Sequence, residues 1–136
     1  MRTLPIRLHP QQNLRRALEG LASAENIQAG FVLQGIGSLG VAMIRFAGMD
    51  QALELRGDME ILTLSGSLSP DGAHLHITVA DAQGRVTGGH VAYGCTVRTT
   101  AEILVAELPG VQFSREPDAE SGCKELVIRG APPAHA

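Results

Sequence analysis

Residues 74–90 read HLHITVADAQGRVTGGH, a pattern that predicts a β-hairpin and, with it, much of the fold. Apolar and polar side chains alternate from His74 to Ala80, which is the period of a strand with one buried face. Turn residues follow at 81–85, and a second strand leads to His90. The length of the loop between the two strands decides which side chains share a face.

Two loop lengths are compatible with this turn, and they place His90 differently. A two-residue loop would put His90 opposite Ile77, on the other face of the hairpin from His76. A three-residue loop over 82–84 would put His90 directly opposite His76. Such loops commonly hold their third residue in the left-handed conformation, where glycine fits without Cβ strain. Gly84 occupies that position, so the sequence favours the three-residue loop.

This register gathers His74, His76 and His90 on one face of the hairpin. Side chains two residues apart in a strand lie about 6.5–7 Å apart, close enough for two imidazoles to converge on one ion. Three neutral nitrogen donors suit a divalent transition metal, zinc first, with nickel, copper or iron as alternatives, and they leave at least one coordination position open. Calcium and magnesium prefer oxygen ligands. The competing interpretation is a set of solvated polar residues on an exposed face.

The remainder of the chain predicts an α+β fold, a largely antiparallel sheet with one clear helix over about residues 14–25. Asn13 can cap the helix, and Leu14, Leu18 and Leu21 form an apolar stripe along it. Further strands are expected at Thr3–Leu8, Phe31–Gly37, Gly40–Ala47, Glu60–Leu68 and Lys124–Ile128, with a turn at Ser38-Leu39. Residues 99–108 fit either a strand or a second short helix.

Length and composition indicate one domain. The chain has 136 residues, of which 44% are apolar and 18% charged, with a mean hydropathy of +0.08. A domain of this size buries enough surface to fold without a disulfide or a metal. We expect a single domain over residues 1–130 and a disordered tail over residues 131–136, which offer nothing to bury.

Charge and composition exclude several functions. The formal net charge is −3, and no basic run exceeds Arg15-Arg16, so direct DNA binding by this chain alone is not expected. The aromatic content of 3% provides no stacking platforms for single-stranded nucleic acid. No apolar stretch approaches the roughly 20 residues of a membrane-spanning helix. Two cysteines and an N-terminus without an apolar signal-peptide core predict a cytoplasmic location.

Several other residues are candidates for the site. Cys95 either approaches the metal or is a buried thiol. Glu60 and Glu102 lie in apolar strands, where each could act as a general base near a metal-bound water or meet a partner at an interface. His9, in a loop, and His135, in the tail, are expected to be solvated.

Four separate segments resemble one known family. These are AGFVLQGIGSL at 29–39, EILTLSGSLS at 60–69, DGAHLH at 71–76 and GGH at 88–90. They resemble the plants-and-prokaryotes-conserved domain (PPC or PCC), and the similarity runs roughly from Leu8 to Ile128. The resemblance implies an α+β domain on an antiparallel sheet, assembled as a homotrimer. Some prokaryotic members carry metal on histidines that match His74, His76 and His90.

The resemblance also bears on DNA. Prokaryotic members are typically stand-alone domains described as candidate DNA-binding proteins, whereas in plants the domain follows DNA-binding AT-hooks and provides trimerisation and protein contacts. This chain has no Arg-Gly-Arg-Pro hook. In its segment 57–62, Asp58 and Met59 stand where plant members have an arginine and an aromatic residue.

Two functions follow as hypotheses. The first is a metal-binding trimeric PPC-domain protein, a DNA-associated regulatory or interaction module that acts through a protein partner. The second is a small zinc-dependent enzyme of the hydrolase or lyase type, with a metal-bound water as nucleophile.

Overall fold

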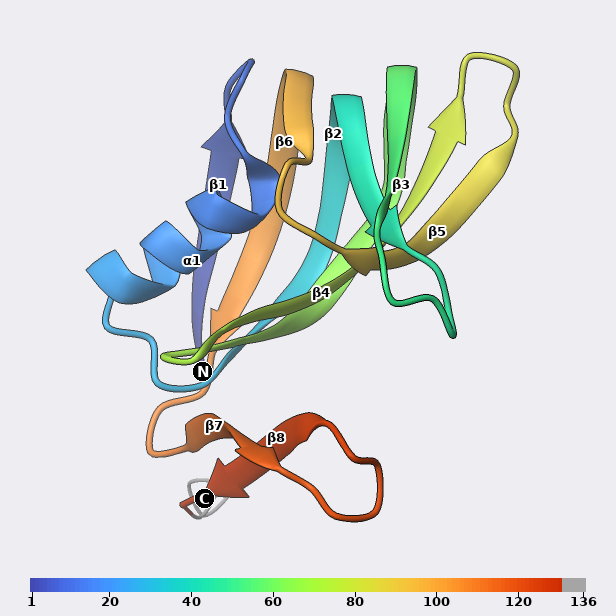
Figure 1. Ribbon diagram of the computed structural model, residues 1–136. Helices are drawn as coiled ribbons and strands as arrows, with labels where there is room; N and C mark the ends of the chain where they lie inside the picture. Colours follow the sequence, from blue (N-terminus) through green and yellow to red (C-terminus); the bar gives the residue numbers. More distant parts are fainter. Residues whose placement is uncertain (131–136) are drawn as a thin grey trace.

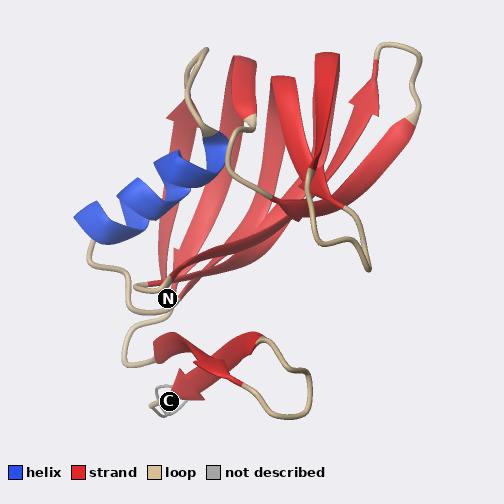
Figure 2. Cartoon of the chain, viewed as in Figure 1, coloured by secondary structure: helices blue, strands red, loops and turns tan. Residues whose placement is uncertain are grey.

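The computed structural model describes residues 1–130, which form one helix and eight strands (Figures 1 and 2). The elements are β1 (Arg2–Leu8), α1 (Leu14–Ala24), β2 (Gly30–Arg45), β3 (Leu53–Ser69), β4 (Gly72–Asp81), β5 (Val86–Val91), β6 (Thr96–Glu107), β7 (Gln112–Pro117) and β8 (Lys124–Arg129). The prediction of a mostly antiparallel sheet with one helix is therefore confirmed. The tail expected at residues 131–136 lies outside the described residues.

Six strands form the main sheet in the order β1-β6-β2-β3-β4-β5, and every pairing is antiparallel. The end of β2 also pairs with β5, where Ile44 lies opposite Val91 and Arg45 opposite His90. The four strands β2 to β5 therefore curl toward one another, as Figure 1 shows. The β4–β5 hairpin, which carries all three histidines, closes this curl through the pairing of β5 with β2. Within residues 1–130, no helix is long and apolar enough to cross a membrane.

Helix α1 covers one face of the sheet (Figure 2). The Asn13 side chain caps it by accepting a hydrogen bond from the Arg16 backbone N–H, as the sequence predicts. Its buried face consists of Leu14, Leu18 and Ala22. These side chains join an aliphatic core that lies between the helix and the sheet.

The turn predicted at Ser38-Leu39 is wrong, because both residues lie inside the continuous strand β2 and are buried. A bulge between Leu39 and Val41 interrupts the pairing but not the strand. Gly37, next to the expected turn, serves close packing of two strands instead. A Cβ on Gly37 would collide with the carbonyl oxygen of Thr100, so glycine lets β2 and β6 approach.

The second short helix considered for residues 99–108 is also wrong, because the segment belongs to strand β6. Buried Ala101, Ile103 and Val105 alternate with exposed Glu102 and Leu104, which is the period of a strand. Pairing with both β1 and β2 holds the segment extended.

Strands β7 and β8 form a separate two-stranded ribbon beneath the sheet in Figure 1. Phe113 of β7 packs edge-to-face against Phe31 of β2, with ring centroids 5.6 Å apart. Arg115 ties the ribbon to the β3–β4 hairpin, because its backbone N–H donates to an Asp71 carboxylate oxygen at 2.8 Å and its Nη2 donates to the Ser67 hydroxyl at 2.6 Å. The ribbon therefore lies against the β3–β4 hairpin, whose strand β4 carries His74 and His76.

Candidate metal centre

The hairpin has the register that brings the histidines together. The Asp81 N–H donates to the Arg85 carbonyl at 2.9 Å, and Gly84 has φ +77°, so the loop has three residues and a left-handed glycine. His76 lies directly opposite His90. The register hypothesis drawn from the turn is confirmed.

His74, His76 and His90 form a compact cluster of imidazoles. The ring centroids lie 5.0 Å apart for His74 and His76, 5.1 Å for His74 and His90, and 5.8 Å for His76 and His90. One nitrogen from each ring lies within 4.8 Å of the others. His74 and His90 are half-buried, whereas His76 is exposed. Small side-chain rotations suffice for all three rings to reach one ion.

The protonation and hydrogen bonding of this cluster fit a metal ligand set. Burial lowers the pKa of His74, and it lowers the pKa of His90 to about 4, so both rings are neutral at pH 7 and can donate a lone pair. The Nδ1 atom of His90 is buried and has no hydrogen-bond partner among residues 1–130. Unpartnered buried nitrogens are rare because desolvation is costly, and a bound ion would compensate this one.

The two glycines before His90 allow close approach of neighbouring backbone. A Cβ on Gly88 would lie 2.7 Å from the Ile77 carbonyl oxygen. One on Gly89 would lie 2.7 Å from the Arg45 carbonyl oxygen. Both glycines therefore permit β5 to sit tightly between β4 and the end of β2, and this packing places His90.

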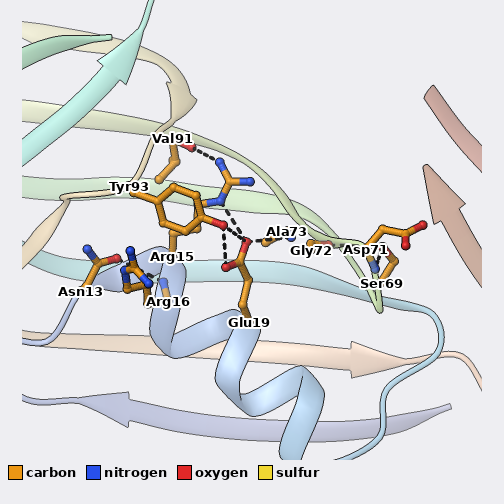
Figure 3. Close-up of polar contacts among 10 residues, drawn as sticks. All are labelled: Asn13, Arg15, Arg16, Glu19, Ser69, Asp71, Gly72, Ala73, Val91 and Tyr93. Carbon is orange, nitrogen blue, oxygen red and sulfur yellow. Dashed lines mark hydrogen bonds and ion pairs between the residues drawn. The ribbon is translucent and has the colours of Figure 1, made fainter. Parts of the chain in front are cut away.

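A carboxylate on the helix fixes the start of β4 (Figure 3). Glu19 accepts hydrogen bonds from the Tyr93 hydroxyl at 2.9 Å, from Arg15 Nε at 3.0 Å and from the Ala73 backbone N–H at 3.1 Å. Burial acts to raise the pKa of Glu19, but these hydrogen bonds outweigh it and leave the pKa lowered. Since Ala73 directly precedes His74, Glu19 helps to position the first histidine.

A pocket of about 350 Å³ adjoins His74 and His76. Its other walls come from β2, β3 and the ribbon, through Phe31, Ser65, Gly66, Ser67, Arg115, Glu125 and Leu126. Ser65 lies opposite His76 and Ser67 opposite His74 in the β3–β4 pairing. The tight turn at Pro70-Asp71 could have predicted these two pairs, because it fixes the register of that hairpin.

Arg115 and Glu125 were missed by sequence reasoning. Strand β7 carries mostly polar residues around one buried Phe113, so it gives little strand signal. No local pattern reports that Arg115 contacts Ser67, which is 48 residues away in the chain.

The other sequence candidates lie away from the cluster. Cys95 is fully buried, its Sγ accepts a hydrogen bond from the Met43 N–H, and burial raises the pKa of its thiol. Glu60 and Glu102 are exposed on β3 and β6, and neither lines the histidine pocket. Cys95 is thus the buried thiol of the two alternatives.

The remaining histidines do not join the cluster. His9 is exposed in the loop after β1. His135 lies outside the described residues.

Comparison with known proteins agrees with this architecture. The model of the Plants and Prokaryotes Conserved (PCC) domain matches residues 1–109. The chain belongs to the PCC domain family. The matched segment includes the PCC sheet, the helix and all three histidines, whereas the β7–β8 ribbon follows it.

Relatives and solved structures share most of the chain. It is 50% identical over 129 residues to the bifunctional protein GlmU of Synechococcus sp. strain JA-2-3B'a(2-13), covering 95% of this chain but only 20% of that protein. A hypothetical protein from Salmonella cholerae-suis is 39% identical, with a TM-score of 0.93 over 95% of this chain and 94% of the other. A metal-containing protein from Archaeoglobus fulgidus has the same fold at 24% identity, with a TM-score of 0.80 over 93% and 94%.

Proposed function

We propose that this PCC-domain protein is a metal-binding regulatory or interaction module in which His74, His76 and His90 hold one divalent transition metal ion. Zinc is the ion that we expect. The observation that carries the proposal is the convergence of three imidazoles, one of them with an unpartnered buried nitrogen. A bound ion of this kind supplies a Lewis-acidic coordination position at which a ligand can attach. The protein's own contribution is to keep His74 and His90 neutral by burial, which lowers the pKa of each, and to fix the orientation of the three rings through the hairpin register.

The relatives support both parts of the proposal, namely metal binding and a role as an interaction module. The Archaeoglobus neighbour is a metal-containing protein. The Synechococcus relatives contain a stretch like this chain as about one fifth of a longer bifunctional protein, as expected for a unit that serves other parts of a chain or a partner. The two free cysteines, Cys95 and Cys123, support a cytoplasmic location.

Metal analysis and calorimetric titration with zinc at pH 7.5 test the proposal. We expect one ion per chain and a folded protein before and after chelation, because a domain of this size folds without metal. A titration that shows no zinc binding at pH 7.5 would contradict the proposed function and show that the three histidines are only solvated side chains.

The affinity for zinc should depend on pH. Protons compete with metal for the imidazoles, and free histidine has a pKa of about 6.5. Because burial lowers the pKa of His74 and brings that of His90 to about 4, these rings stay neutral below pH 6.5. We expect affinity to be nearly constant from pH 8 to 7 and to fall between pH 6.5 and 4. Titrations in non-coordinating buffers across this range measure it.

We further propose that the chain assembles as a homotrimer. Large apolar side chains are exposed on β2, β3 and β6 at Leu33, Ile36, Leu62 and Leu104. An exposed apolar sheet face of this kind is typical of a protein–protein interface. The family resemblance suggests that two further copies of the chain bury it. Light scattering at micromolar concentration should give about three times 14.3 kDa. A particle of the mass of one chain would contradict the trimer.

Binding to random duplex DNA should be weak or absent near physiological salt. Three chains together carry about −9, from −3 each, and a polyanion requires a basic surface. Fluorescence anisotropy with a labelled duplex measures this directly. A submicromolar dissociation constant with a steep salt dependence would contradict the expectation.

A zinc-dependent enzyme of the hydrolase or lyase type is the second candidate. The pocket of about 350 Å³ beside His74 and His76 favours it, because a small molecule could reach an open coordination position there. A screen of hydrolase substrates with the zinc-loaded protein and its chelated form separates the two candidates.

A further inference from the structure

The β7–β8 ribbon adds charge to the histidine pocket from outside the matched PCC segment. The family model ends at residue 109, and the ribbon begins at Gln112. Arg115 of β7 lines the pocket together with His74 and His76.

Arg115 is held in place but is not neutralised. The Ser67 hydroxyl and the Asp71 carboxylate fix its side chain and its backbone, respectively. Among residues 1–130, no carboxylate lies within ion-pair distance of its guanidinium. Most of the five N–H donors of an arginine are therefore available to a ligand. A half-buried, anchored and unpaired guanidinium is typical of a group that recognises an anion.

A second unpaired arginine lies at the other side of the cluster. Arg45 of β2 is directly opposite His90, so the two side chains share a face. Within the described chain it forms no ion pair, and its Nη1 donates to the Met49 carbonyl at 3.2 Å. The carboxylate that lines the pocket is Glu125. Two guanidiniums without an ion-pair partner thus flank the cluster, and a bound divalent ion would add further positive charge beside them.

We propose that this pocket binds a small molecule carrying an oxyanion, a carboxylate or a phosphate, which Arg115 orients against the histidine cluster. Phe31 and Leu126 form the apolar wall that receives the body of the molecule. The proposal deepens the metal-binding function above and rests on it. It also gives the ribbon a role, namely to select the ligand of a site whose metal donors lie in the sheet.

Three aromatic probes of similar size test the class of ligand. Benzoate carries a carboxylate, phenyl phosphate carries a phosphate, and benzamide is the neutral isostere of benzoate. Calorimetry on the zinc-loaded protein at pH 7.5 should show benzoate, phenyl phosphate or both binding at least about tenfold more tightly than benzamide, because charge-assisted hydrogen bonds exceed neutral ones. The stronger of the two anions identifies the oxyanion that the site prefers. Equal affinity for all three probes would overturn the proposal.

Two variants of the ribbon assign the effect to one residue. Arg115→Gln should weaken binding of the anionic probe about tenfold to a hundredfold and leave that of benzamide unchanged. Arg129→Gln is the matched control, because Arg129 lies on the same ribbon, pairs with Glu116 and does not line the pocket. Arg115→Lys, which keeps the charge, should recover part of the affinity and shows that the ribbon is still in place. Equal losses in Arg115→Gln and Arg129→Gln would contradict the assignment.

Zinc titrations of the same proteins keep the two proposals distinguishable. Arg115→Gln should bind zinc at least as tightly as the parent, since it removes a nearby positive charge. If the parent protein binds no zinc, the proposed function fails. If zinc binds but the anion affinity does not depend on Arg115, only the ligand proposal fails.

Discussion

Replacement of His76 by alanine should lower the affinity for zinc by about a hundredfold or more. His76 lies opposite His90 and two residues from His74 on the same strand, so its loss leaves only two of the three imidazoles. Structural zinc sites with four ligands bind with roughly 10–16 kcal/mol, which is about 2.5–4 kcal/mol for each ligand. Competition titration with a chromophoric chelator measures a change of this size.

The variant should remain folded, because the His76 side chain is exposed and its removal opens no cavity in the core. His9→Ala is the matched control, since His9 is an exposed histidine outside the cluster. We expect no change in zinc affinity for this control. If His76→Ala and His9→Ala bind zinc equally well, the ion is held elsewhere.

Replacement of Gly66 by alanine should destabilise the protein by more than about 3 kcal/mol. Gly66 has φ +148° in β3, a conformation that costs other residues on the order of 1–3 kcal/mol. Its Cβ would also collide with the carbonyl oxygen of His74 and lie 2.7 Å from the Cα of Leu75. The collision involves backbone on both sides, so β3 and β4 must separate to relieve it. Urea unfolding followed by circular dichroism gives the change in the free energy of unfolding.

Gly40→Ala provides the matched control within a strand. A Cβ at Gly40 meets no atom within 4 Å, and its φ is not positive. Its stability should change by less than about 1 kcal/mol in either direction. A similar loss of stability in both variants would show that the close approach of backbone at Gly66 is not the cause of the destabilisation. Because β4 carries His74, the Gly66 variant should also lose zinc affinity.

The histidine register was predictable because it depends on a local feature. The number of residues in the loop between β4 and β5 determines whether His76 and His90 share a face, and Gly84 indicates a loop of three residues. No contact with a distant segment is required. The helix was predictable for the same reason, since its cap and its apolar stripe lie within one segment. Local patterns of this kind determine a candidate site when all of its donors lie on one hairpin.

The features that sequence reasoning missed depend on contacts between distant segments. Gly37 carries the same local signal whether it forms a turn or permits two strands to approach, and only the neighbouring β6 decides between these roles. Strand β7 is extended because it pairs with β8 and packs Phe113 against Phe31. Arg115 consequently joins the pocket through tertiary packing that no short pattern encodes.

The placement of all three histidines on one hairpin has a consequence for the order of folding. The donor set spans only residues 74–90, whereas β1 pairs with β6 across about a hundred residues of chain, as Arg2 with Glu107. Closing a short loop costs less chain entropy than closing a long one, and hairpins form within about 1–10 μs. The imidazoles can therefore meet before the ends of the sheet do. If zinc binds as proposed, a refolding chain in the presence of zinc should form this hairpin before the outer strands of the sheet pair.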